Sequence, residues 1–318
     1  MREQYADVAL LGQRVIEQVE RVIVGKRAVL EQIMAATLAG GHVLLEDYPG
    51  LAKTLIARSF AAALGLEFRR IQFTPDLLPG DITGGYVYNR AADRFELRRG
   101  PVFANIVLAD EINRASPKTQ SALLEAMQER QVTLEGETMP LPEPFLVLAT
   151  QNPIEYEGTF PLPEAQLDRF LMKLSIGYPS PEEEREILRR RRERRRDDAV
   201  IEQVTNAEEL LAMRDAIEDV YVDADIEEYI VRLVAATRSD ARVAVGASPR
   251  GSLALLKLAR VRAALDGRDF VIPDDVKVFV RPALAHRLIL TPDLWMQRRA
   301  AEEILSAVLQ AIPAPVMR

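Results

Sequence analysis

One stretch of the chain decides how the rest is interpreted, and from residue 46 to residue 54 it runs Glu46-Asp47-Tyr48-Pro49-Gly50-Leu51-Ala52-Lys53-Thr54. It joins a short apolar run at 42–46 to a segment at 52–64 with the apolar spacing of a helix. A loop between a strand and a helix points successive backbone N–H groups and the helix N-terminus toward one place. Such a place suits the oxygens of a triphosphate.

The last two residues of this stretch carry its most specific chemistry. Lys53 would reach the β- and γ-phosphates, and the hydroxyl of Thr54 would hold Mg²⁺. The stretch departs from the pattern G-x-x-x-x-G-K-[ST], because Asp47 and Ala52 replace its two glycines. Alanine at position 52 predicts a helical backbone there and not a positive φ. The residues expected to surround the phosphates are Asp47, Tyr48, Pro49, Gly50, Leu51, Ala52, Lys53 and Thr54.

Two adjacent acids, Asp110 and Glu111, follow a second apolar run at 105–109. Beside a phosphate-binding loop, Asp110 would hold Mg²⁺ through water and Glu111 would polarise the attacking water. A buried strand that ends in polar residues is common on its own. Its combination with Lys53 and Thr54 on an earlier strand–loop–helix favours a nucleoside triphosphate site.

Three more residues are candidates for this site. Asn152 follows an apolar run at 145–149, and the carboxyl ends of parallel strands are where such sheets bind ligands. Its amide could orient water against the γ-phosphate, although an Asn-Pro pair alone also forms an ordinary turn. Arg169 and Arg250 could stabilise charge in the transition state, an effect worth about 10³–10⁵ in rate. A structural salt bridge is the alternative for either arginine.

The order of segments along the chain predicts the fold. Apolar runs alternate with helices up to residue 176, which predicts a mostly parallel sheet covered by helices on both faces. Two inserts, at about 84–100 and 131–143, have the composition of hairpins. From about residue 203 the segments are helical and no strand is evident. We therefore expect an α/β nucleotide-binding domain at 1–198 and a smaller all-helical domain at 199–318. Its helical segments are expected at 206–220, 224–239, 248–265, 273–288 and 292–312.

The composition excludes several classes of function. The 41 Lys and Arg against 48 Asp and Glu make the chain acidic, which disfavours broad binding to nucleic acids or anionic membranes. There is no cysteine, and the two histidines, His42 and His286, lack ligand-like spacing, so no transition-metal site is expected. No run approaches the roughly 18 apolar residues of a membrane span, and the first residues do not form a signal peptide. These features favour a cytoplasmic protein.

An arginine-rich run at 189–196 ends a helix that the capping pattern at Ser180 begins. Acidic residues at the start of a helix and basic residues at its end complement the helix dipole. We therefore favour a solvated interdomain helix over a nucleic-acid patch.

Taken together, the sequence resembles the MoxR family of AAA+ ATPases. The resemblance extends from about residue 21 to about residue 311, and its segments occur in the family's order. The segments that carry it are 44–50, 108–115, 149–153, 164–170 and 248–250. Tyr48 stands where the family usually has a smaller residue.

The resemblance implies a role for each matching position. Lys53 and Thr54 correspond to Walker A, and Asp110 and Glu111 to Walker B. The remaining matches are Asn152 as sensor 1, Arg169 as the arginine finger, Arg250 as sensor 2, and Val24 and Gly25 beside the adenine.

The resemblance also implies a function. Such proteins bind ATP and Mg²⁺, form rings that are usually hexameric, and act as chaperone-like ATPases that assemble or activate other proteins. Their partners often contain a von Willebrand factor A domain, which this chain lacks. The two hairpins correspond to the helix-2 insert and the pre-sensor-1 hairpin, where Tyr86 and Tyr88 could touch a client, although packing within the hairpin is favoured.

Two other functions stay open from the sequence. The first is a nucleotide-gated scaffold that binds an A-domain partner but hydrolyses ATP slowly. The second is a nucleic-acid motor of the same clade, which the acidic charge and the absence of a DNA-binding module disfavour.

Overall fold

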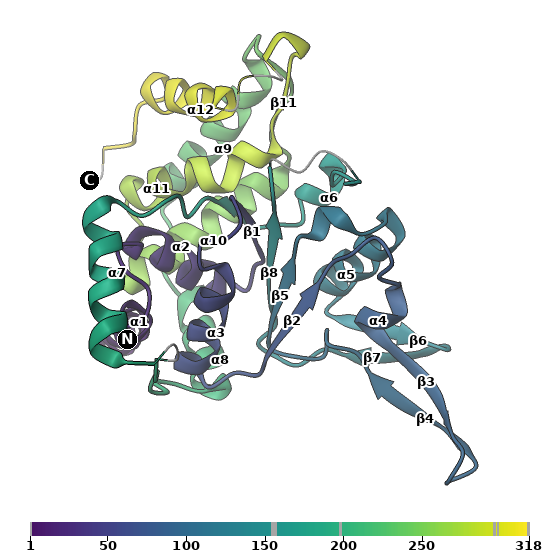
Figure 1. Ribbon diagram of the computed structural model, residues 1–318. Coiled ribbons are helices and arrows are strands. Elements are labelled where there is room, and N and C mark those ends of the chain that lie inside the picture. The colour runs from purple at the N-terminus through teal and green to yellow at the C-terminus, as the bar shows by residue number, and fades with distance from the viewer. Residues whose placement is uncertain (1, 154–157, 197–198, 295–296, 298, 317–318) are drawn as a thin grey trace.

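The computed structural model describes residues 2–153, 158–196, 199–294, 297 and 299–316. At its centre is a five-stranded sheet in the order β2-β5-β8-β1-β9, in which every neighbouring pair is parallel (Figure 1). The predicted parallel sheet is confirmed. Its strands are β1 (Val43–Glu46), β2 (Phe68–Gln72), β5 (Ile106–Asp110), β8 (Leu146–Gln151) and β9 (Met172–Leu174).

Helices cover both faces of this sheet, so its central strands are buried on both sides. Successive side chains of a strand point to opposite faces. Leu45 and Leu108 accordingly belong to one apolar core, on the face that the first three helices cover. Leu44 and Val107 belong to a second core on the opposite face. The helices of the first core are α1 (Arg2–Glu20), α2 (Arg27–Leu38) and α3 (Lys53–Leu64), and those of the second are α4 (Pro79–Thr83) and α5 (Pro117–Glu129).

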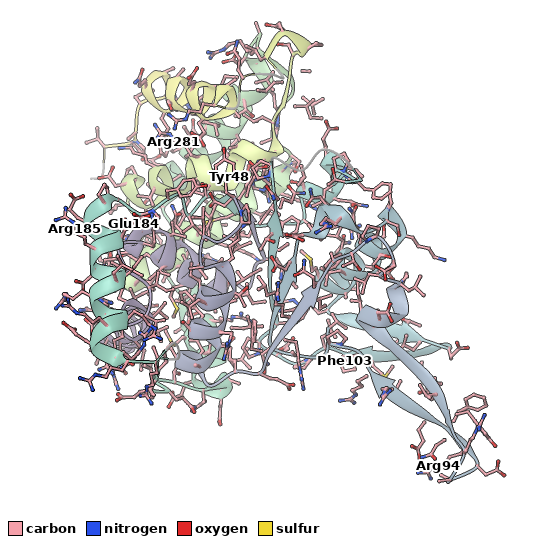
Figure 2. All side chains as sticks on the ribbon, in the orientation of Figure 1. Tyr48, Arg94, Phe103, Glu184, Arg185 and Arg281 are labelled. Atoms are coloured by element: carbon pink, nitrogen blue, oxygen red, sulfur yellow. The ribbon has the colours of Figure 1, made fainter. Side chains whose placement is uncertain are left out.

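Serine side chains cap the starts of two of the helices. At α5, the hydroxyl of Ser116 accepts from the backbone N–H of Thr119. At α7 (Pro181–Arg194), Ser180 and Glu183 form the predicted capping box. No residue of α7 is buried, and Arg185 points away from the body of the molecule (Figure 2). The inner side of this helix contacts the rest of the chain, where Arg190 donates to the backbone oxygen of Glu20 at 2.6 Å. The arginine-rich run thus ends a surface helix, and its assignment as a solvated interdomain element stays a prediction.

Both inserts form antiparallel hairpins, as predicted. The first is β3 (Gly84–Asn89) with β4 (Arg94–Arg99), and the second is β6 (Gln131–Leu134) with β7 (Glu137–Pro140). The first hairpin projects from the body of the molecule, with Arg94 near its tip (Figures 1 and 2). Tyr88 packs against Phe95, and the hydroxyl of Tyr86 donates to Glu137 of the second hairpin at 2.8 Å. Both tyrosines therefore have packing partners within the hairpins.

The C-terminal part is mostly helical but contains one small sheet that the sequence analysis missed. β10 (Val243–Val245) pairs antiparallel with β11 (Ile289–Leu290). Strands of two and three residues are too short for a periodicity to be visible. The segment predicted at 273–288 divides into α11 (Pro273–Leu284) and a 3₁₀ turn, η2 (Ala285–Arg287), and that at 292–312 into a 3₁₀ turn, η3 (Pro292–Leu294), and α12. The other helices are α8 (Ala207–Glu218), α9 (Ala224–Ser239), α10 (Pro249–Leu265) and α12 (Ala300–Ala311).

This C-terminal part, called the lid below, packs through apolar contacts on helices that cover one face of the sheet. Leu255, Leu258 and Val261 of α10 are fully buried in the same core as α1 and α2. The predicted domain boundary at 198 and 199 lies at the limit of the described residues and stays a prediction. Over the described part of the chain, no helix is long and apolar enough to cross a membrane.

Candidate active site

A cavity of about 450 Å³ opens at the carboxyl end of the sheet. Its size is within the range of small-molecule sites. The structure brings together here the loop after β1, the acids after β5 and the asparagine after β8, as the sequence predicts. The lining residues are Pro49, Gly50, Leu51, Ala52, Lys53, Thr54, Leu55, Arg70, Asp110, Glu111 and Asn152.

The backbone of Ala52 differs from the prediction. Its φ is 57° and its ψ is 19°, which is a left-handed conformation. The prediction of a helical backbone was therefore wrong. The loop must reverse before α3 begins at Lys53, and this requirement overrides the preference of an alanine, at a cost of about 1–2 kcal/mol. A left-handed residue at this place aligns the backbone with the start of α3.

Lys53 lies within the cavity, and its Nζ donates to the backbone oxygen of Asp47 at 2.6 Å. Burial lowers the pKa of Lys53, while the carboxylates of Asp47, Asp110 and Glu111 oppose this shift. The side chain therefore sits among acceptors where an incoming phosphate would compete for it.

The carboxylate of Asp47 does not line the cavity but contacts the chain that follows β9. It is buried, and it accepts from the backbone N–H groups of Ile176 and Gly177 and from the hydroxyl of Ser175. These contacts attach the phosphate loop to the end of β9. The aspartate that replaces the first glycine of the usual pattern thus helps to hold the loop in place.

Thr150, one strand away, orients both acids. Its hydroxyl donates to Asp110 Oδ1 at 2.7 Å and accepts from the backbone N–H of Glu111 at 2.8 Å. Glu111 itself has a left-handed backbone, with a φ of 57°. This turn separates the two carboxylates, so that each can take a different role.

Further side chains that the sequence analysis did not identify contact these acids. Arg70 of β2 pairs with Asp110 Oδ2 at 2.6 Å, and Gln72 of the same strand donates to Glu111 at 2.7 Å. Arg114 pairs with Glu111 at 3.0 Å. Arg70 and Gln72 are two residues apart and therefore share one face of β2. The polar residues at positions 70 and 72 of that strand were the available signal, but only the sheet order shows what they face.

The oxygen ligands at the cavity fit Mg²⁺. Magnesium binds oxygen and usually takes one or two carboxylates together with phosphate and water. Thr54 supplies a hydroxyl, and the carboxylate of Asp110 is mostly buried beside it. These two residues would hold a Mg²⁺ ion that enters with a nucleotide.

The residues expected beside the adenine, Val24 and Gly25, are not among the lining residues of this cavity. Gly25 has a φ of 71°, a left-handed conformation that favours glycine. The preceding residue, Val24, is half-buried. Tyr48, which was expected near the phosphates, does not line their cavity. It stacks on Tyr178 with ring centroids 5.7 Å apart and lines an adjoining cavity of about 910 Å³ at the junction with the lid.

Arg169 and Arg250 lie elsewhere. They line a separate cavity of about 270 Å³ beside Gly40 and Gly41, at the amino end of β1. The phosphate loop follows the carboxyl end of the same strand, and four residues at about 3.3 Å each place about 13 Å between the two edges. The other basic residues at this cavity are Arg130, Lys257 and Arg287.

Comparison with known proteins agrees with this geometry. Residues 42–172 match the family "ATPase family associated with various cellular activities (AAA)", and residues 235–308 match the AAA lid domain. The chain is 51% identical to protein YeaC of Bacillus subtilis, over 97% of this chain and 96% of YeaC. It is 47% identical to the chaperone MoxR1 of Mycobacterium tuberculosis, over 95% of this chain and 82% of MoxR1.

A crystal structure of a candidate ATPase from Cytophaga hutchinsonii has the same fold, with a TM-score of 0.92 and 40% sequence identity. The match covers 99% of this chain and 98% of that one. Fold and cavity thus define a AAA+ nucleotide-binding core with its lid. The chain belongs to the MoxR family of AAA+ ATPases, which confirms the resemblance.

Proposed function

We propose that this protein hydrolyses ATP in a ring of identical subunits to drive the assembly or activation of partner proteins. The observation that carries the proposal is the separation of two groups of residues. Lys53 and the two acids lie at the carboxyl edge of the sheet, whereas Arg169 and Arg250 lie at its amino edge.

The carboxyl edge would bind and position the nucleotide. Lys53 would exchange its contact with the Asp47 carbonyl for the β- and γ-phosphates. Mg²⁺, held by Thr54 and Asp110, would neutralise phosphate charge. Glu111 would accept a proton from water as its oxygen attacks the γ-phosphorus, while the bond to the β–γ bridging oxygen breaks and ADP leaves.

Asn152 would orient this water. Its side chain is buried at the cavity, directly after the end of β8. This position is suited to an amide that contacts the attacking water and the γ-phosphate at once. Val24 and Gly25 would lie beside the base.

The amino edge would complete the site of a neighbouring subunit. Arg169 and Arg250 line one cavity that includes no residue of the phosphate loop. Because β1 separates them from their own nucleotide, we assign both arginines to the nucleotide of the adjacent subunit. A closed ring, usually of six subunits in the family, is the arrangement that repeats this contact without leaving an unpaired end.

The partners follow from the family. A relative is named a chaperone, and we propose a chaperone-like role in the cytoplasm for this chain as well. A separate protein with a von Willebrand factor A domain would link the ring to its client.

A slowly hydrolysing, nucleotide-gated scaffold is the second candidate. The ion pairs of Arg70 with Asp110 and of Arg114 with Glu111 favour it, because both acids are engaged and must be released before they act. Turnover that stays very low in an assembled ring would support this function over the first.

The test is ATP hydrolysis per subunit as protein concentration rises, with particle size measured in parallel. We expect specific activity to increase as a ring assembles. Constant specific activity in a stable monomer would contradict the shared site and leave a simpler nucleotide-binding switch.

A further inference from the structure

The lid of each subunit contacts the segment that carries Arg169. Arg287 lies in η2 of the lid, and its Nη2 donates to the backbone oxygens of Asp168, at 3.3 Å, and Phe170, at 3.0 Å. These are the residues on either side of Arg169. The side chain of Phe170 is fully buried, so the main chain is held on both sides of the arginine.

Arg287 differs from the two arginines that we assign to the neighbour's nucleotide. Its side chain is only 4% exposed, and its Nε forms an ion pair with Asp168 Oδ1 at 3.0 Å. Its Nη1 donates to the backbone oxygen of Ala283 at 2.8 Å. Every nitrogen of its guanidinium thus contacts a protein oxygen, whereas half of the Arg250 side chain is exposed. Arg287 is placed to hold the chain and not to bind a phosphate.

Asp168 provides a second link to the lid. Its carboxylate accepts from the hydroxyl of Ser248, the N-cap of α10, at 3.1 Å. The Nε of Arg250, two residues further, lies 3.8 Å from the same carboxylate. One aspartate therefore contacts both lid elements that approach the Arg169 segment.

We propose that Arg287 is a positioning residue, which holds the main chain on both sides of Arg169 and makes the placement of Arg169 depend on the lid of its own subunit. The inference rests on the proposed function, in which Arg169 acts in the neighbouring site. A movement of the lid in one subunit would then change hydrolysis in the next subunit of the ring.

The experiment combines two variants that damage different halves of the site. Arg287→Gln has an intact nucleotide cavity but a loosened Arg169 segment. Glu111→Gln has an inactive nucleotide cavity but an intact Arg169 segment. Each is assayed alone and in mixed rings for hydrolysis, and binding is measured with a fluorescent ATP analogue.

We expect Arg287→Gln alone to bind the ATP analogue as wild type does and to keep its KM, while kcat falls about tenfold to a hundredfold. A displacement of 1 Å at a reacting group can cost about a hundredfold. Mixing with Glu111→Gln should raise the hydrolysis per Arg287→Gln subunit, because its cavity then receives a well-placed Arg169. Mixing with Arg169→Ala should give no increase, since both subunits lack a working finger.

Two results would overturn the proposal. One is a wild-type kcat in Arg287→Gln. The other is a deficit that Glu111→Gln subunits do not relieve, which would mean that the damage lies in the variant's own cavity or in its folding. If Arg287→Gln does not fold, Asp168→Asn and Arg287→Lys undergo the same mixing, with the same pattern expected and a smaller deficit for the lysine.

A reference mixture separates this inference from the proposed function. Arg169→Ala mixed with Glu111→Gln should recover activity if sites are shared. No recovery there would defeat the shared site itself. Recovery there without recovery for the Arg287 variants would defeat only the role of Arg287.

Discussion

The two edges of the parallel sheet carry different chemistry, although the same strands build both. At the carboxyl edge, Lys53, Asp110 and Glu111 surround a cavity of nucleotide size. At the amino edge, Arg169 and Arg250 face a second cavity, and among the described residues none lines both. On the proposed function, one subunit therefore holds two complementary halves of different sites, and neither half is active alone.

The largest effect is expected from removing the finger at the amino edge. Arg169→Ala should lower kcat by about 10³–10⁵, because the charge that develops at the γ-phosphate loses its partner. The variant's affinity for ATP should stay near wild type, since its own nucleotide lies at the other edge. Steady-state hydrolysis and titration with a fluorescent nucleotide measure the two quantities.

A mixture then tests whether the halves combine. Lys53→Ala should lose at least about a hundredfold in ATP affinity, because the main phosphate cation is gone. Mixed rings of Arg169→Ala and Lys53→Ala should regain activity, because some interfaces then join an intact cavity to an intact finger. Absence of recovery at every mixing ratio would argue against sharing.

The next effect concerns the carboxyl edge alone. Glu111→Gln should bind ATP but hydrolyse it at least about a hundredfold more slowly, because the acceptor for the water proton is lost. Glu125→Gln, the same change at an exposed position of α5, is the matched control and should hydrolyse ATP normally. Normal turnover in Glu111→Gln would remove this residue from the mechanism.

Two histidines near the amino edge should make the folded chain less stable as the pH falls. His42 and His286 are buried near this edge, and burial lowers their pKa to about 4 and about 3. Both are neutral in the folded chain but take up a proton on unfolding below their ordinary pKa of 6.5. The contribution of these two neutral histidines to the free energy of unfolding is therefore fully present above about pH 6.5. It falls toward pH 4, by up to about 1.4 kcal/mol per pH unit for each histidine.

Urea denaturation between pH 7.5 and pH 5 measures this loss, in a range above the titration of most carboxylates. His42 bridges two elements, since its Nδ1 accepts from Val147 and its Nε2 lies 3.1 Å from the Met127 oxygen. His42→Gln should be less stable at pH 7.5 but lose less stability on acidification. An unchanged pH dependence in this variant would contradict the assignment.

The smallest effect is expected at Ala52, and it tests the backbone of the phosphate loop. Glycine removes the steric cost of the positive φ but adds freedom to the unfolded chain, so Ala52→Gly should change stability by less than about 1 kcal/mol. Valine is far less tolerant of this conformation, and Ala52→Val should be clearly less stable. Equal urea midpoints for the alanine and valine proteins would contradict the left-handed backbone.

Much of the carboxyl edge could be predicted from the sequence. Apolar runs mark buried strands, and the ends of parallel strands meet at one edge of a sheet. Thr54, Asp110 and Asn152 could therefore be placed together without knowledge of the sheet order. The backbone of Ala52 could not be predicted, because the geometry of the loop overrides the residue's own preference.

The sequence by itself determined the class of fold, the phosphate loop and the acids beside it, since these depend on local pattern and on a general rule for parallel sheets. Only the tertiary structure decided that Arg70 faces Asp110, that Arg169 and Arg250 share a cavity, and that Arg287 contacts the backbone oxygens on both sides of Arg169. These contacts join residues 40 to 119 positions apart. The order of the strands in the sheet brings the first pair together, and packing of the lid on the core brings the others together. No local sequence pattern predicts either arrangement.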